Sequence, residues 1–324
     1  MTMGWRAWLL LLLLLLLLGW PRPGRPDLQD VDTVLPGYKN SSLLSWPCGQ
    51  QTVPTRIIGG QDSELGRWPW QGSLRYWDTH ICGASLLNRR WVLSAAHCFE
   101  QSSHPFDWSV QFGEISSSPS FFNLQAYNNR YRVEQIILSP QFLGTGPYDI
   151  ALLKLSSPVT YDSFVQPICV LPSTYQLRNQ NNCWITGWGE IAEDTSLPYP
   201  STLQEVQVGM INNSVCSHLL SMPDFRQDVW GDMVCAGDAE GGKDACFGDS
   251  GGPLVCKTRG LWVQVGVVSW GIGCGRPNRP GIYTNVSQHF RWIQSFLSGS
   301  SSAGQAPCLL LLLGSVLWLL HPQT

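Results

Sequence analysis

Charged residues are scarce in this chain of 324 residues, and none of them is arranged for binding nucleic acid. Only 13% of the residues are charged, the formal net charge is -3, and lysine and arginine form no basic block. A protein that tracks a phosphate backbone needs such a block, so we expect no nucleic-acid partner. The 44% of hydrophobic residues, 32 glycines and 22 prolines instead indicate a folded, turn-rich protein dominated by β-structure.

The chain also lacks an apolar run that spans a bilayer comfortably, since roughly 20 residues are needed. Leu9 to Leu18 follows Arg6 and precedes the helix-breaking stretch Pro21-Arg22-Pro23-Gly24. This pattern is typical of a secretory signal peptide, which we place at residues 1–20. Uncleaved anchoring is the alternative, because the small-residue cleavage pattern is poor. Secretion agrees with the eleven cysteines and with three glycosylation sequons, at Asn40, Asn212 and Asn285.

The C-terminal tail has a composition of its own. Small polar residues fill 298–303, and after a short spacer Leu309 to Leu320 is apolar except for Gly314 and Ser315. This order is typical of a signal for attachment of a glycosylphosphatidylinositol (GPI) anchor. Residues 298–324 would then be a signal and removed propeptide, leaving the protein on the outer face of the cell membrane. A short membrane span and an incidental tail on a freely secreted protein are the alternatives. The candidate attachment residues are Ser298, Gly299 and Ser300.

Between these ends the chain divides into two parts. Residues 21–56 have no sustained periodicity and indicate a pro-segment without a core of its own. From there to about Tyr283, short apolar runs alternate with turn residues, which predicts many short strands in a sandwich or barrel. The clearest runs are Trp91–Leu93, Ile150–Leu155, Cys183–Thr186 and Trp262–Trp270. Further on, apolar residues recur at helical spacing and predict a terminal helix, at Val286, Phe290, Ile293 and Leu297.

The most informative motif is the acidic, glycine-rich turn Lys243 to Pro253, which has Ser250 next to two glycines. A serine hydroxyl attacks only with a general base beside it and a third group that holds the base. His97, in the stretch Leu93 to Cys98, and Asp149, in the stretch Tyr148 to Leu153, supply both in the chain order His, Asp, Ser. A lone histidine after two alanines is usually a packed core residue. The three contexts together instead predict a catalytic triad.

These motifs resemble those of the trypsin-like serine proteases of the chymotrypsin family, and the resemblance covers Arg56 to about Leu297. It implies an all-β fold of two six-stranded antiparallel β-barrels with a C-terminal helix, in a catalytic domain of residues 57–297. It also implies a serine endopeptidase that works through an acyl-enzyme and needs no cofactor, with His97, Asp149 and Ser250 as catalytic residues. The backbone N–H groups of Gly248 and Ser250 would form the oxyanion hole. An ordinary turn glycine is the alternative for Gly248.

The same resemblance implies a specificity. Asp244 matches the carboxylate at the base of the S1 pocket, which favours arginine or lysine at P1, whereas the alternative is a solvated loop acid. Gly271 and Gly281 match pocket-wall positions where larger side chains block entry. Since Ala245 replaces a serine whose hydroxyl helps to satisfy a lysine ammonium, we expect cleavage after arginine more than lysine. Two further residues match the segment that pairs with the substrate main chain, Ser269 and Trp270.

Activation is implied by Arg56-Ile57-Ile58-Gly59-Gly60. In the family, cleavage after the arginine frees an α-ammonium, here on Ile57, that pairs with the acid before the nucleophile, here Asp249. Loss of either charge from such a buried pair is strongly destabilising. The pairing raises the pKa of the Ile57 amine, so we expect activity to be lost as pH rises through that raised value. The activator would be another trypsin-like protease or a second copy, and protein protease inhibitors are expected partners.

The resemblance also bears on the cysteine pairings and on whether a metal is bound. Cys308 is left without a partner, in the tail that lipid anchoring would remove. The family's calcium loop has acids at both ends, but here Glu114 faces Asn128-Asn129-Arg130, so we expect no metal. The family pattern implies five disulfides: Cys48–Cys169, Cys82–Cys98, Cys183–Cys256, Cys216–Cys235 and Cys246–Cys274.

A different class of function is compatible with the same fold. Some relatives of such proteases are inactive binding modules at the cell surface, since a fold does not fix a function. Such modules normally lose a triad member, the pocket or the activation site. This chain retains all of them, which favours an active enzyme.

Overall fold

The computed structural model describes residues 44, 47–53, 61–120, 122–144, 146–174, 177, 180–221, 229–238 and 240–299. All of them belong to one compact unit, Lys39–Thr324. The predictions for the signal peptide, Asn40, Arg56, Ile57 and the tail from Ser300 onward concern residues outside this set. No described helix is both long enough and apolar enough to cross a membrane.

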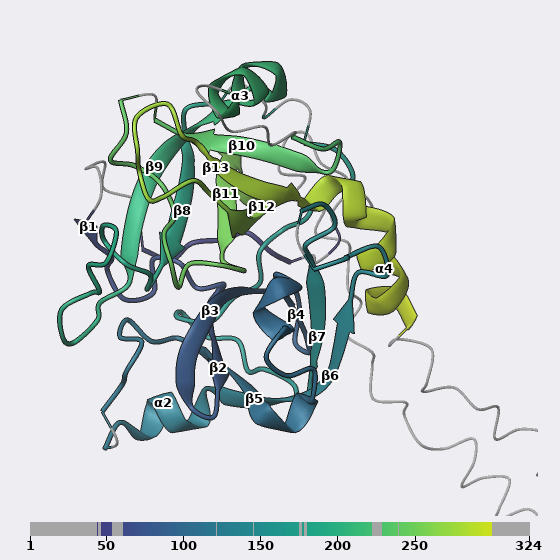
Figure 1. Ribbon diagram of the computed structural model, residues 1–324. Coiled ribbons are helices and arrows are strands. Elements are labelled where there is room, and N and C mark those ends of the chain that lie inside the picture. Colours follow the sequence, from purple (N-terminus) through teal and green to yellow (C-terminus); the bar gives the residue numbers. More distant parts are fainter. Residues whose placement is uncertain are drawn as a thin grey trace, which may run out of the picture. The chain divides into compact units, whose positions relative to one another are not determined.

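The first barrel consists of antiparallel strands that close in the order β2-β3-β4-β7-β6-β5 (Figure 1). Side chains alternate between the interior and the surface along these strands, as in β6, where Tyr131 and Val133 are buried and Arg132 is exposed. Large apolar side chains of these strands, such as Leu74 and Phe112, are fully buried. The strands are β2 (Gln71–Tyr76), β3 (Thr79–Leu86), β4 (Trp91–Ser94), β5 (Trp108–Phe112), β6 (Arg130–Leu138) and β7 (Ala151–Leu155).

The second barrel has the order β9-β10-β13-β12-β11-β8 and closes through the pairing of β8 with β9, while β1 (Gln61–Asp62) adds to the free side of β9. Its core includes Ile185, Leu254 and Tyr283. The two six-stranded antiparallel barrels confirm the predicted all-β fold. The strands are β8 (Cys183–Gly187), β9 (Gln204–Ile211), β10 (Met233–Gly237), β11 (Pro253–Thr258), β12 (Leu261–Trp270) and β13 (Gly281–Asn285).

The predicted terminal helix is α4 (Phe290–Gly299), preceded by the 3-10 turn η5 (Val286–His289). Val286 and Ile293 are fully buried in the same apolar cluster as the first barrel, and the Phe296 ring lies 6.0 Å from that of Trp91. The C-terminal helix therefore packs on the first barrel although it follows the second. The other helices are α2 (Leu124–Asn128), α3 (Asn213–Leu220), η2 (His97–Phe99) and η3 (Pro105–Asp107).

Buried polar contacts join the two barrels. Ser85 Oγ, on β3, donates to Gln264 Oε1, on β12, at 2.7 Å, and both side chains are buried. Arg67, just before β2, forms an ion pair with Glu205, on β9, at 2.8 Å, and neither side chain is more than 1% exposed. Such pairs are strongly destabilising to break, because the remaining partner stays buried and unpaired. They fix the relative position of the barrels and hence of the residues between them.

A segment ahead of the barrels is tied to both. Gly49 donates its N–H to Pro167 O at 2.8 Å and accepts from Trp262 N at 2.9 Å. The Gln51 side chain accepts from Trp262 Nε1 at 3.0 Å and donates to the carbonyl of Arg67. The adjacent disulfide Cys48–Cys169 is one of five among the described residues, and these are the five pairs that the family resemblance implied.

Candidate active site

His97 and Asp149 are held together between the barrels. His97 begins η2, and its backbone N–H donates to Asp149 Oδ1 at 2.9 Å while Nδ1 lies 2.6 Å from Oδ2. Because a carboxylate only accepts hydrogen bonds, Nδ1 carries a proton and Nε2 of the neutral ring is left as an acceptor. Ser269 Oγ, from β12 of the second barrel, donates to the same Oδ2 at 2.5 Å. Asp149 is buried and therefore orients the imidazole from a fixed position.

The environment shifts the pKa values of this pair in opposite directions. Burial acts to lower the pKa of His97, but the hydrogen bond and the charge of Asp149 outweigh it and hold the pKa above its ordinary value. Burial acts to raise the pKa of Asp149, but His97 and Ser269 outweigh it and hold the pKa below its ordinary value. The arrangement thus stabilises an imidazolium next to a carboxylate, which is the charge state of a histidine that has accepted a proton.

Ser250 lies on the turn that leads into β11. Its carbonyl accepts from Gly83 N, on the first barrel, at 2.7 Å, and the next residue, Gly251, donates to Val268 O at 2.8 Å. Ser250 and His97 line the same cavity of about 390 Å³. Among the described residues no hydrogen bond joins the imidazole to the Ser250 hydroxyl. In structures without substrate such catalytic contacts are often long and shorten only in the complex.

The backbone before Ser250 presents two free donors. Gly248 has φ +98°, a left-handed conformation that favours glycine, and a Cβ there would lie 3.0 Å from Gly189 Cα. Its carbonyl accepts from His80 Nε2 at 3.1 Å. Within the described part of the chain, the N–H groups of Gly248 and Ser250 donate to no acceptor. Two unpaired N–H groups near a nucleophile suit the binding of a developing negative oxygen.

His80 was not found from the sequence, because nothing in its surroundings marks it. Since its Nε2 donates to a carbonyl, Nδ1 accepts from Ser73 Oγ, which lies 2.8 Å away. Burial lowers the pKa of His80 to about 4, so the ring is neutral at physiological pH and keeps this tautomer. The first barrel thereby fixes the peptide of Gly248.

The same cavity extends to Asp244, whose carboxylate lies at the second-barrel strand β13. Oδ1 accepts from Ala245 N at 2.8 Å and from Tyr283 Oη at 3.4 Å. A Cβ at Gly281 would collide with this carboxylate, and one at Gly271 would lie 3.9 Å from Oδ2. Burial raises the pKa of Asp244 to about 7, against the hydrogen bonds that it accepts. A desolvated carboxylate at this place favours a cationic ligand. Ser269 and Trp270 line the cavity as well.

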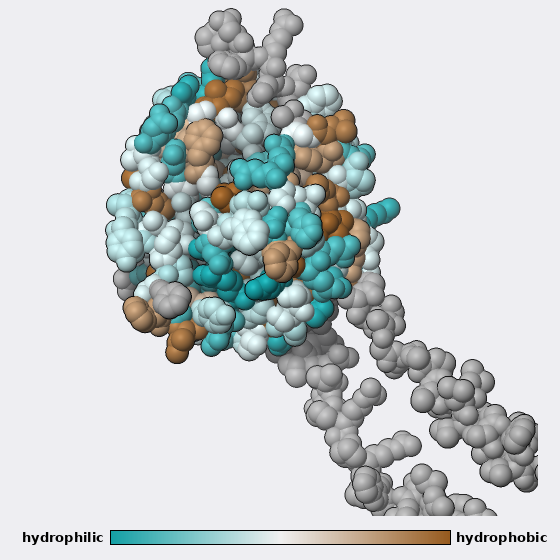
Figure 2. All heavy atoms as spheres, turned by 60° about the horizontal axis from the view of Figure 1, so that its bottom comes forward, coloured by the Kyte–Doolittle hydropathy of each residue, from teal (hydrophilic) through white to brown (hydrophobic). Residues whose placement is uncertain are grey.

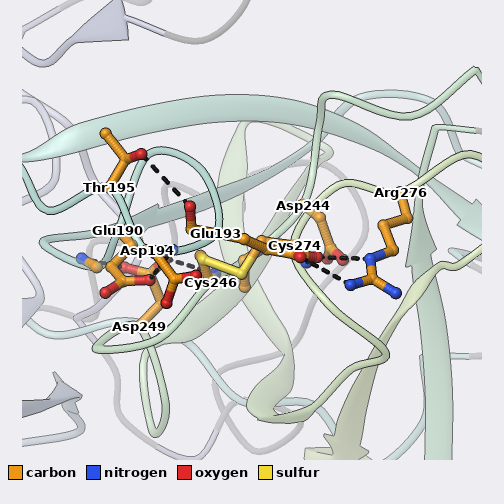
Figure 3. The surroundings of a disulfide bond; sticks show 11 residues. Glu190, Glu193, Asp194, Thr195, Asp244, Cys246, Asp249, Cys274 and Arg276 are labelled. Atoms are coloured by element: carbon orange, nitrogen blue, oxygen red, sulfur yellow. Dashed lines mark hydrogen bonds and ion pairs between the residues drawn. A yellow bond between two sulfur atoms is a disulfide. The ribbon is translucent and has the colours of Figure 1, made fainter.

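One wall of this cavity is tied to the nucleophile turn by the disulfide Cys246–Cys274 (Figure 3). Cys274 also donates its N–H to Glu193 Oε1 at 3.1 Å. Arg276 completes the arrangement with two charge-assisted hydrogen bonds to Glu193, at 2.6 and 2.7 Å. Residues 190–196 are thereby attached to the cavity wall, a contact between loops that their separate sequences do not indicate.

A second cavity, of about 200 Å³, surrounds Asp249. The buried carboxylate accepts from Gly189 N at 2.8 Å and Cys246 N at 2.9 Å. Burial raises its pKa to about 6. No cationic side chain among the described residues pairs with it, and a buried carboxylate normally requires such a partner. Gln204 and Glu205, which pair with β1, also line this cavity.

Other sites have less catalytic potential. A cavity of about 340 Å³ is bordered by residues of β5 and α2, and its described lining residues include no histidine. Polar and apolar residues are mixed over the face of the molecule that Figure 2 shows. In the loop that was compared with the family's calcium loop, Glu114 accepts from Asn123 Nδ2 at 3.2 and 3.3 Å. Of the described sequons, Asn212 is exposed, whereas Asn285 is only 3% exposed and caps η5. A glycan on Asn285 is therefore not expected in this fold.

Comparison with known proteins agrees with this geometry. The family described as Trypsin matches residues 57–293. Human testisin is 59% identical over 288 residues, which cover 88% of this chain and 92% of testisin. Human serine protease 41 is 47% identical over 317 residues, which cover 98% of this chain and 99% of that protein. The chain is a serine endopeptidase and belongs to the trypsin family of serine proteases.

Proposed function

We propose that this endopeptidase cleaves extracellular or cell-surface proteins after arginine, and less efficiently after lysine, with Ser250 as its nucleophile. The observation that carries the proposal is that His97, Ser250 and Asp244 line one cavity of about 390 Å³. A nucleophile, a base and a carboxylate for a cationic side chain are therefore within reach of one bound peptide.

The chemistry follows from the orientation of His97. Its Nε2 accepts the proton of Ser250 Oγ as Oγ forms a bond to the substrate carbonyl carbon. The resulting oxyanion is bound by the N–H groups of Gly248 and Ser250, and loss of one such donor typically lowers turnover by about 100- to 1000-fold. The imidazolium, stabilised by Asp149, then protonates the departing amine. Water hydrolyses the acyl ester by the same steps, which returns the proton to Ser250.

The preference for arginine is supported by the lining around Asp244. A guanidinium presents a planar pair of donors that one carboxylate accepts without help. A lysine ammonium has three donors and requires further acceptors, and Ala245 offers no hydroxyl beside Asp244 Oδ1. The substrate main chain would extend the sheet along Ser269 and Trp270, at the end of β12.

We also propose that the chain is a zymogen activated by cleavage after Arg56. The cavity around Asp249 supports this, because the buried carboxylate has no cationic partner among the described residues. Ile57 precedes β1 by four residues, and four extended residues span at most about 14 Å. Because β1 pairs with Gln204 and Glu205, which line the same cavity as Asp249, this short link supports a pairing of a new Ile57 ammonium with Asp249. Another trypsin-like protease or a second copy would make the cut.

The proposed precursor consists of a signal peptide (residues 1–20), a light chain (21–56), a catalytic domain (57–297) and a GPI-attachment signal (298–324). The disulfide Cys48–Cys169 would keep the light chain attached. The small-residue site, the spacer and the apolar tail support a lipid anchor at the outer face of the cell membrane. Two of the candidate attachment residues, Ser298 and Gly299, form the last turn of α4. Protein inhibitors of serine proteases are proposed partners.

The test uses the secreted precursor, cleaved by immobilised trypsin that is then removed. Matched peptide amides that differ only at P1 should be hydrolysed in the order arginine, lysine, phenylalanine. An aryl phosphonate should label the cleaved protein and neither the Ser250→Ala variant nor an uncleaved Arg56→Gln precursor. Absence of labelling after complete cleavage would overturn the proposal. Release of the full chain from cells by a phosphatidylinositol-specific phospholipase tests the anchor separately.

A further inference from the structure

The residue before Asp149 has an unusual backbone conformation. Tyr148 has φ +64°, in the left-handed region that bulky side chains rarely adopt. Such a conformation persists only where its surroundings hold it, and it is found preferentially at functional sites. The path of the chain through Tyr148 determines how Asp149 enters the site.

Asp232, from the second barrel, holds this backbone. Its Oδ2 accepts the N–H of Tyr148 at 2.6 Å, and Asp232 is 7% exposed. Asp232 lies immediately before β10, and its carbonyl accepts from Asn285 N, at the end of β13, at 2.7 Å. The backbone of Asp232 is therefore tied to two strands of one barrel while its carboxylate binds a peptide of the other.

His289 contacts the same oxygen of Asp232. Its Nε2 donates to Asp232 Oδ2 at 3.4 Å, and both side chains are 8% exposed. The His289 ring also meets the Tyr148 ring edge-on, with centroids 6.0 Å apart and an angle of 90° between the planes. The pair Asp232–His289 thus contacts the residue that precedes Asp149, a member of the pair Asp149–His97.

Three contacts from the second barrel hold the chain at Asp149. Ser269 Oγ donates to its carboxylate, and Thr284 Oγ1 donates to its carbonyl at 2.7 Å. Asp232 is the contact that fixes the preceding peptide. A cavity of about 550 Å³ borders Tyr148, Asp232 and His289, so the backbone has room to move if this contact is lost.

We infer that Asp232, supported by His289, is a positioning residue that holds the left-handed backbone at Tyr148 and thereby aims Asp149 at His97. The inference rests on the proposed catalytic role of Asp149. Because Asp232 is not among the residues that line the substrate cavity, the inference predicts a change in kcat without a change in KM. Turnover should depend on Asp232, whereas occupancy of the arginine-binding slot should not.

The test compares Asp232→Ala and Asp232→Asn in the cleaved, full-length enzyme. A misplacement of about 1 Å in a catalytic group lowers rates by up to about 100-fold. We expect Asp232→Ala to lower kcat by about 10- to 100-fold, with KM and the affinity for benzamidine within about twofold of wild type. Asp232→Asn retains an acceptor oxygen for Tyr148 N–H and should keep kcat within about threefold. Rates are normalised to the concentration of benzamidine-binding sites.

Ser85→Ala is the matched control, since it removes another buried hydrogen bond between the barrels, at Gln264, far from Asp149 in the sequence. It should lower the melting temperature and leave kcat unchanged. If Asp232→Ala does not fold, Asp232→Leu fills the site with an apolar side chain and still lacks an acceptor. A kcat within threefold of wild type in the non-accepting variant, or an equal fall in Ser85→Ala, would overturn the inference. Failure of wild-type enzyme to hydrolyse arginyl substrates would instead refute the proposed function.

Discussion

From the raised pKa of Asp244 we predict how strongly the affinity for a cationic ligand depends on pH. A benzamidinium ion, which resembles the head group of arginine, should bind only to the ionised carboxylate. With a pKa of about 7, the ionised fraction is about 0.9 at pH 8 and about 0.01 at pH 5. The dissociation constant should therefore rise about 90-fold over this range, which is about 2.7 kcal/mol of binding free energy. An aspartate with the ordinary value of 3.8 would change the affinity by about 1.1-fold.

The sign of the effect follows from the site itself. Burial stabilises the neutral acid of the free enzyme, and the bound cation favours the ionised form, so binding near pH 7 should release protons. Titration calorimetry in buffers of different ionisation enthalpy measures both the affinity and the number of protons released. His97→Ala removes the histidine that lines the cavity, and the pKa of Tyr283, which lines it too, is raised far above this pH range by burial. Asp244→Asn supplies the baseline, since any slope that remains in it comes from groups elsewhere, such as Asp249.

One result would refute this reasoning. If the affinity of the His97→Ala enzyme is the same at pH 8 and pH 5, the carboxylate is ionised throughout and burial does not control it. The thermal unfolding temperature should be measured at each pH, so that loss of the folded state is not mistaken for loss of binding.

Three further predictions concern other parts of the site. For an ester substrate without a cationic P1 side chain, kcat/KM should fall as pH drops through a value above 6.5, because Asp149 raises the pKa of His97 in the free enzyme and the protonated ring accepts no proton. A midpoint at or below 6.5 in this pH profile contradicts the prediction. Glu193→Gln and Arg276→Gln should each raise KM for arginyl peptides by about two- to fivefold. Exchange of the two charges should restore part of that loss, and no recovery would argue against their pairing. After activation, gels without reductant should show one band and gels with reductant two, whereas Cys48→Ser should release the light chain in both.

The sequence predicted the strands well where apolar runs are short and bounded by turns. Trp91–Leu93 and Cys183–Thr186 lie within β4 and β8. Each apolar run has the length of a short buried strand and is too short for a helix. Closure into two barrels came from the family resemblance, since alternation alone does not determine which strands pair. The terminal helix was also predicted, but its first apolar residue, Val286, belongs to a 3-10 turn.

In the active site, the sequence motifs predicted the residues within each motif but not the distant residues that contact them. The contacts that support the motifs join distant parts of the chain: Ser269 reaches Asp149 across 120 residues, and His80 reaches Gly248 across 168. Packing of one barrel on the other creates these contacts, and no local pattern records it. The sequon at Asn285 illustrates the same limit, since the motif specifies chemistry but not the burial that follows from the end of β13.

The segment around Cys48 and Gln51 has a practical consequence for following activation. Its bonds to Trp262 and Pro167 and its disulfide do not involve the Arg56–Ile57 peptide. An antibody against this face should therefore recognise precursor and mature enzyme equally. If the proposed activation is right, an immunoassay for it has to detect loss of the intact Arg56–Ile57 segment, because the new amino terminus would be buried.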